Sequence, residues 1–69
     1  MNIEVIKKLN GGVDGLISTL EINEDCAVNS IWITDQERDQ VKELVKELRK
    51  AIKEERPDYK SPYEDILAE

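Results

Sequence analysis

The segment from Thr34 to Pro57 constrains the fold of this chain more than any other stretch. Thr34 and Glu37 have the spacing of a capping box, in which each side chain accepts a hydrogen bond from the other residue's backbone N–H. The apolar residues that follow recur at helical spacing: Val41, Leu44, Val45, Leu48, Ala51 and Ile52. Because Pro57 cannot continue a helix and restricts the residue before it, the sequence predicts one amphipathic helix over about 35–55.

The length of this helix limits how the domain can be built. At 1.5 Å per residue it would be about 31 Å long, whereas a compact chain of 69 residues has a radius of gyration of roughly 11 Å. The helix must therefore cross the whole domain or protrude from it. Its apolar stripe is broad and covers only about two heptads, which argues against a long coiled coil.

Two segments before this helix are rich in β-branched residues. "LISTLEI" and "AVNSIWIT" flank the polar stretch "NEDC", which is typical of a turn between strands. We therefore expect a β-hairpin that runs directly into the helix at Thr34. Its register stays open, because the length of the turn decides whether Trp32 or its neighbours Ile31 and Ile33 face the helix.

The first residues fit two structures. Ile3, Val5 and Leu9 alternate as in a strand, and "NGG" is a hairpin turn signal, but Ile3, Ile6 and Leu9 also share one helical face. The glycines that follow make a helix that continues past residue 10 improbable. The predicted fold class is α+β, with a small β-meander or β-hairpin over about 2–33 before the long helix. The alternative is an all-α helical hairpin.

The tail begins what looks like another helix. Ser61 can cap it, Pro62 suits its first position and Glu64 completes a second capping box, so we expect a short helix over about 62–68. It would place three apolar residues on one face: Tyr63, Ile66 and Leu67. So short a helix needs a docking place, either on its own core or in a groove on another chain. We divide the chain into a single small domain, 1–56, and a tail with a docking helix, 57–69.

Charge excludes some classes of partner. The formal net charge is −6, which disfavours direct binding to nucleic acid or to anionic lipid. The acidic excess lies in the two ends of the chain, since residues 1–33 and residues 57–69 each carry a net charge of −3 and residues 34–56 are neutral. We therefore expect a protein partner, which includes a second copy of the chain, and neither nucleic acid nor a membrane.

The sequence lacks the residue types that most catalytic and metal sites require. With no histidine and a single cysteine, Cys26, the chain cannot form the usual zinc sites, catalytic triads or an internal disulfide. We expect no enzyme activity, no cofactor and no metal site. A single free cysteine and the lack of a signal peptide or a membrane-spanning apolar run indicate a cytoplasmic protein.

These observations favour a small acidic intracellular protein-binding module, a regulator or adaptor that is a homo-oligomer. The predicted partner-binding residues are Trp32 in the sheet, Glu24 and Asp25 in the turn, and Tyr63, Ile66 and Leu67 in the tail. One alternative is an acidic mimic of nucleic acid that inhibits a host protein, as in phages or mobile elements. Another is a small structural component of a larger assembly.

Overall fold

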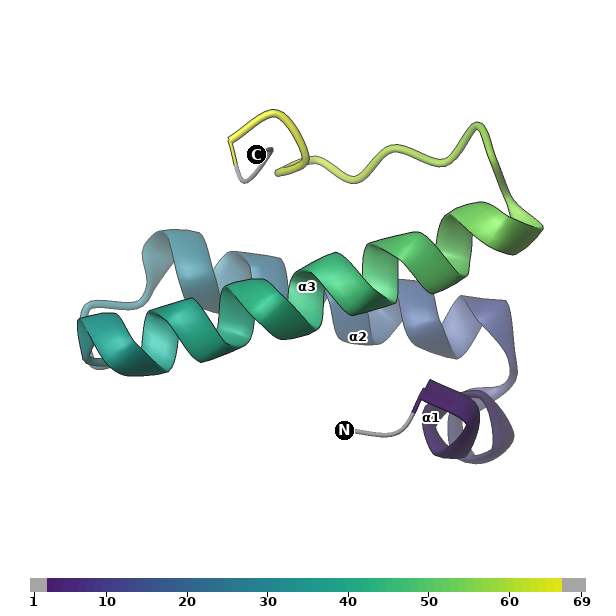
Figure 1. The fold of residues 1–69 in the computed structure, drawn as a ribbon, viewed down its shortest axis with the longest axis horizontal. Coiled ribbons are helices and arrows are strands. Elements are labelled where there is room, and N and C mark those ends of the chain that lie inside the picture. Colours follow the sequence, from purple (N-terminus) through teal and green to yellow (C-terminus); the bar gives the residue numbers. More distant parts are fainter. Residues whose placement is uncertain (1–2, 67–69) are drawn as a thin grey trace.

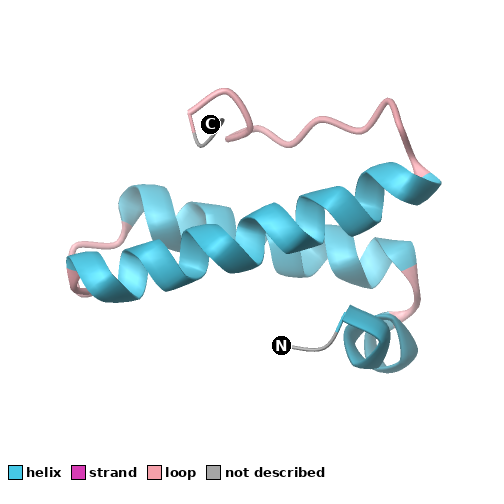
Figure 2. Ribbon diagram, in the orientation of Figure 1, coloured by secondary structure: helices cyan, strands magenta, loops and turns pink. Residues whose placement is uncertain are grey.

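Three helices make up the regular structure of residues 3–66. The computed structural model describes residues 3–66, and within them the helices are α1 (Ile3–Asn10), α2 (Val13–Asn29) and α3 (Asp35–Glu55). Helices α2 and α3 lie side by side and are joined by a short loop, and α1 packs against α2 at the far end from that loop (Figure 1). Figure 2 shows helix and loop alone over these residues.

The predicted β-meander or β-hairpin over 2–33 is wrong. The described part of this stretch is helical over Ile3–Asn10 and Val13–Asn29, so the alternative all-α helical hairpin agrees with the structure instead. The stretch "NEDC", predicted as a turn, lies inside α2. The glycines do end the first helix, as expected, but the turn they make joins two helices and not two strands.

The core explains why residues 13–29 form a helix. Helix α2 buries four side chains, those of Leu16, Leu20, Glu24 and Ala27. Their spacing of four, four and three residues places them on one helical face. Tertiary packing of this face overrides the β-propensity of the segment. The buried cluster unites all three helices: Ile6, Leu16, Leu20, Val45, Leu48 and Ile52.

The corner between α1 and α2 depends on glycine. Gly11 and Gly12 have φ of 88° and 77°, a region that L side chains rarely adopt. The Gly12 N–H donates to the Lys7 carbonyl at 2.7 Å and closes the end of α1. Within α2, a Cβ on Gly15 would lie only 2.4 Å from the Asn10 carbonyl oxygen, so the close approach of the two helices requires glycine there.

Helix α3 matches the sequence prediction. It runs from Asp35 to Glu55 after a capping box between Thr34 and Glu37. The molecule measures 31 × 23 × 15 Å, so a helix of about 31 Å crosses its whole length. Val45, Leu48 and Ile52 of its predicted apolar stripe are buried.

The tail turns back at the end of α3 and runs along the helix pair (Figure 1). Over residues 62–66 it forms turns in place of the predicted helix, with Glu64 N–H donating to Ser61 at 3.2 Å and Ile66 N–H to Tyr63 at 3.1 Å. Contrary to the prediction, the Ser61 hydroxyl does not cap a helix but donates a hydrogen bond to Glu24 of α2. Leu67 and the rest of the predicted helix lie outside the described residues.

Candidate functional site: the loop between α2 and α3

The loop of residues 30–34 displays two large apolar side chains to solvent. Ile31 is 83% exposed and Trp32 is 89% exposed, the highest values among the large hydrophobic residues that the structure describes. Isolated exposed apolar residues are ordinary on protein surfaces, but a tryptophan beside an isoleucine at one projecting end is the composition of an interface anchor. Trp32, predicted as a residue of a sheet, therefore lies on a loop.

The backbone of this loop is held in place from both sides. On the α2 side, the Ser30 N–H donates to the Cys26 carbonyl at 3.1 Å, and the Trp32 N–H lies 3.3 Å from the Ser30 hydroxyl oxygen. Arg38 of α3 reaches across to the same place, where its guanidinium donates to the carbonyls of Ala27 and of Ser30, the latter at 3.0 Å. The two exposed side chains thus project from a fixed backbone.

The capping box fixes the α3 side of the loop. The Thr34 N–H donates to the Glu37 carboxylate at 2.8 Å, and the Glu37 N–H donates to the Thr34 hydroxyl at 3.1 Å. The Thr34 N–H, and after it the Thr34 side chain, lowers the pKa of Glu37 below its ordinary value of 4.5. Glu37 therefore stays negatively charged beside the loop.

Three exposed carboxylates follow the exposed pair along the chain. Asp35, Glu37 and Asp39, which we call the acidic collar, are all exposed in the first turns of α3. Arg38 is the only basic residue between positions 25 and 41, and its guanidinium is hydrogen-bonded to loop carbonyls. The end of the molecule that carries Ile31 and Trp32 therefore also carries three exposed carboxylates in the first turns of α3.

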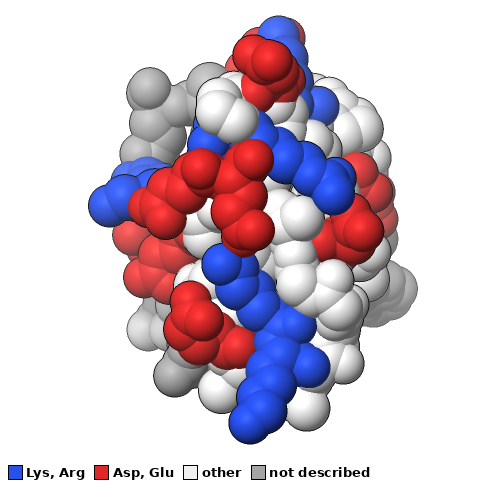
Figure 3. Space-filling model, turned by 90° about the vertical axis from the view of Figure 1, so that its right-hand side faces the viewer, with Lys and Arg blue, Asp and Glu red and all other residues white. Residues whose placement is uncertain are grey.

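The opposite end of the molecule has a different charge pattern. Figure 3 views that end, where basic and acidic side chains lie interspersed. Two ion pairs link the elements there, Lys7 with Glu55 and Arg56 with Asp14, each at 2.8 Å. This end neutralises its charges by pairing, whereas the loop end presents carboxylates together with apolar side chains.

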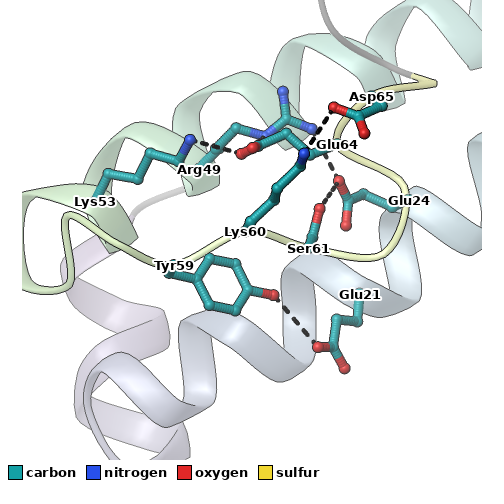
Figure 4. A network of polar contacts seen from close by, with 9 residues as sticks. All are labelled: Glu21, Glu24, Arg49, Lys53, Tyr59, Lys60, Ser61, Glu64 and Asp65. Atoms are coloured by element: carbon teal, nitrogen blue, oxygen red, sulfur yellow. Dashed lines mark hydrogen bonds and ion pairs between the residues drawn. The ribbon is translucent and has the colours of Figure 1, made fainter.

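A second polar cluster attaches the tail to the helix pair (Figure 4). Its centre is Glu24 of α2, which is fully buried and accepts hydrogen bonds on Oε2 from Ser61 at 2.6 Å and from Arg49 at 2.8 Å. Glu64 adds an ion pair with Lys53 at 2.6 Å and lies 3.4 Å from the Nε of Arg49. The tail thus brings one hydroxyl and one carboxylate to a carboxylate of α2 and two cations of α3.

Alternate residues of the tail face α2. The Tyr59 hydroxyl lies 3.3 Å from Glu21, and the Tyr63 hydroxyl donates to Asp25 at 2.9 Å, with Ser61 between them. Tyr59 and Ser61 lie in the irregular part of the tail, and Tyr63 lies in the turns that follow it. Burial, followed by the nearby negative charge of Glu21, raises the pKa of Tyr59 from 10.0 to about 12.

The structure separates the predicted site residues into different environments. Asp25 and Tyr63 are brought together in a hydrogen bond, and Glu24 is buried beneath the tail and not in an exposed turn. Ile66 is 66% exposed. None of these contacts involves Trp32, so the five predicted residues that the structure describes do not form one surface.

Several residues of these two places were not singled out from the sequence. Ile31 is nearly as exposed as Trp32 and is its neighbour in the chain. In the predicted hairpin the two side chains would alternate between opposite faces, so the sequence does not predict that both are exposed. Arg49 has no place in the sequence prediction, and Ser61 is predicted only as a helix cap, yet both contact the buried Glu24. The tail's alternation of Tyr59, Ser61 and Tyr63 was the available signal for an extended segment that docks on one side.

The described residues offer no recognisable metal centre. Among residues 3–66 there is no group of three or more acidic or cysteine side chains placed to hold a metal ion. Cys26 is a half-buried free thiol on α2. None of the helices in that range combines the length and the apolar character needed to cross a bilayer.

Comparison with protein-family models, with curated proteins and with solved structures gives no match to this chain in any of the three. The properties of the site therefore have to be argued from its own geometry.

Proposed function

We propose that this protein is a small intracellular protein-binding module without catalytic activity, and that the loop of residues 30–34 is its contact surface. The observation that carries the proposal is the nearly complete exposure of Ile31 and Trp32 on a backbone fixed by Arg38 and by two helix caps. A rigid loop loses little conformational freedom when it binds, and this lack of an ordering cost favours association.

The energetics of the two side chains suit this role. Burying a large apolar side chain contributes roughly 1.5–3 kcal/mol to association, and tryptophan is the residue most enriched among interface hot spots. Ile31 and Trp32 contribute nothing comparable to the fold, because both are more than four-fifths exposed. Their conspicuous exposure is consistent with a surface that is covered by a partner.

The charge placement supports this function over mimicry of nucleic acid. A mimic would need a continuous acidic row that includes Glu24, Asp25 and Glu64, but Glu24 is fully buried and Glu64 is paired with Lys53 at 2.6 Å. The end shown in Figure 3 also mixes both signs of charge. The absence of histidine from the sequence and the single free Cys26 support a non-catalytic protein in a reducing compartment, the cytoplasm.

The test is a quantitative capture experiment with a matched control. The tagged wild-type protein, the loop variant Ile31→Ser/Trp32→Ser and the control variant Leu9→Ser/Ile22→Ser would be incubated with an extract of the source cells. The control removes two exposed apolar side chains, 75% and 69% exposed, outside the loop. We expect a protein that is retained by wild type and control and is released by the loop variant. Retention that is equal with all three proteins would contradict the proposal.

Self-association is examined with the same variants. If the partner is a second copy, the solution mass by light scattering should exceed 7.9 kDa for wild type and control, and should return to 7.9 kDa for the loop variant. A truncation of the binding tryptophan typically costs about 2 kcal/mol or more, which is a loss of affinity of about 30-fold. Either kind of partner should therefore respond clearly to the loop substitution.

A further inference from the structure

The acidic collar assigns a chemistry to the partner. Resting on the function proposed above, we propose that the loop of residues 30–34 inserts into an apolar pocket of another protein whose rim carries lysine or arginine. Two features carry it: the exposed Ile31–Trp32 pair, and the exposed carboxylates of the collar, Asp35, Glu37 and Asp39, which follow the pair in the first turns of α3.

The first step is the orientation of the charges. Arg38, the only cation in this part of the chain, is part-buried and directs its guanidinium to the carbonyls of Ala27 and Ser30. The positive charge of Arg38 therefore contacts the loop backbone, while Asp35 and Asp39, before and after it in the sequence, are exposed. A partner that covers Ile31 and Trp32 must meet these carboxylates at the edge of the contact.

The second step is the persistence of the negative charge. The Thr34 N–H donates to the Glu37 carboxylate at 2.8 Å and stabilises its ionised form. Carboxylates at the rim of an interface repel a partner of like charge and steer one of opposite charge. The apolar centre supplies contact area, and the collar selects a basic rim.

The negative charge of the collar also disfavours three other partners: an anionic bilayer, a nucleic acid and a second copy of the chain. An anionic bilayer or a nucleic acid could take up an exposed tryptophan, but both would bring phosphates against the collar. A second copy would bring its own collar, unless it offered a basic and apolar surface. The charge complementarity therefore favours a different protein with a basic rim.

The test uses two labelled synthetic peptides that contain no tryptophan. One is an amphipathic helix of leucine and lysine, and the other has glutamate in place of every lysine. Fluorescence anisotropy of the peptide label gives the dissociation constant at low ionic strength. We expect the lysine peptide to bind at least about tenfold more tightly than the glutamate peptide, because the rim charges of the contact are then opposite.

Two charge variants separate the collar from the net charge. Asp35→Asn/Asp39→Asn removes two carboxylates beside the loop, and Glu54→Gln/Asp58→Asn removes two exposed carboxylates outside the loop and the collar. Both change the net charge by the same amount. We expect the collar variant to bind the lysine peptide about three- to tenfold more weakly, and the distant variant to change by less than about twofold. Circular dichroism would verify that both variants keep their helix content.

Every other outcome overturns the inference. Equal weakening in both variants would assign the attraction to net charge, and binding of neither peptide would remove it. A blue shift of Trp32 emission on vesicles of phosphatidylcholine and phosphatidylserine, stronger than with the lysine peptide, would assign the loop to a membrane surface. A mass above 7.9 kDa that the loop variant abolishes would assign it to a second copy.

The same data distinguish this inference from the function on which it rests. If Ile31→Ser/Trp32→Ser abolishes capture of a partner while the two peptides bind equally, the loop is a contact surface and only the basic rim is wrong. If that variant binds partner and peptides as the wild type does, the loop is not the contact surface and both proposals fail.

Discussion

At the scale of single residues, Glu24 is the side chain with the most demanding environment. It is fully buried, and its Oε2 accepts from Ser61 at 2.6 Å and from Arg49 at 2.8 Å, while Oε1 has no hydrogen-bond partner among the described residues. Burying a carboxylate is costly unless it is paired, and removing one partner leaves the other charge uncompensated. The cluster therefore selects how the tail docks more than it adds to overall stability.

Glu24→Gln should destabilise the protein by about 1–3 kcal/mol, because it removes the charge that compensates Arg49 while it keeps the shape of the side chain. Urea denaturation followed by circular dichroism measures the change. Glu21→Gln, one turn earlier on the exposed surface of α2, is the matched control and should change stability by less than about 0.5 kcal/mol. Equal effects of the two substitutions would show that the cluster around Glu24 is not formed.

Trp32→Ala should leave the free energy of unfolding within about 0.5 kcal/mol of wild type, because the side chain is 89% exposed. Leu48→Ala, which removes a fully buried side chain of α3, should cost about 2–5 kcal/mol. Thermal unfolding of the two variants gives the comparison. A loss for Trp32→Ala as large as that for Leu48→Ala would place the tryptophan in a core.

Tyr59 should have a pKa well above that of an ordinary tyrosine. Its pKa is raised from 10.0 to about 12 by burial and then by the charge of Glu21. Because the folded state holds this proton more tightly, the stabilising contribution is complete below pH 10.0 and is lost as the pH rises towards about 12. Ultraviolet titration of the phenolate measures the pKa, and Tyr59→Phe should remove the late step. Titration of Tyr59 near 10 would contradict its docked position.

At the scale of elements, the start of α3 controls both the helix and the loop before it. Thr34→Ala removes one side of the capping box and should cost about 1 kcal/mol. In the wild type, the lowered pKa of Glu37 gives a contribution that is present above pH 4.5 and is lost as the pH falls through the pKa of the folded state. Thr34→Ala keeps the backbone N–H that stabilises the Glu37 carboxylate, so the variant that tests this contribution is Glu37→Gln. Its stability curve against pH should converge with that of the wild type in acid. A constant difference at all pH values would contradict this account of the cap.

The elements differ in how much of them could be predicted. Helix α3 was predicted to its ends, because its cap, its apolar stripe and Pro57 all point to the same structure. Helix α2 was predicted as strands because its signals conflict. Glu24 occupies a core position of its apolar face, Ile22 is 69% exposed, and Gly12 provides no side-chain cap. The helical period is visible in α2 only once a buried carboxylate is accepted as part of the core.

The tail shows how a local signal can be used for something else. Ser61, Pro62 and Glu64 have the spacing of a helix start, but the Ser61 hydroxyl and the Glu64 carboxylate both have partners on the helix pair. Eight residues gain little from helix formation in water, so side-chain contacts with α2 and α3 outweigh it. No local pattern predicts these contacts, because each partner lies in another element: Glu24, 37 positions from Ser61, is in α2, and Lys53 is in α3.

At the scale of the whole molecule, the two ends have separate characters. The end with α1 pairs its charges across elements, and the end with the α2–α3 loop combines exposed apolar side chains with carboxylates. The tail docks on its own helix pair and contributes Tyr59 to the border of the core. Trp32 was singled out from the sequence because it is the only tryptophan, but its neighbours could not be inferred without the correct fold.

The central claim is that Trp32 projects into water from a folded chain. The most direct measurement is acrylamide quenching of its fluorescence, in the native protein and in urea, at low and at high protein concentration. We predict that the native quenching constant at low concentration is close to that of the unfolded chain, because the side chain is 89% exposed. Strong protection from quenching at low concentration, with a blue-shifted emission, would contradict the claim and place Trp32 in the core.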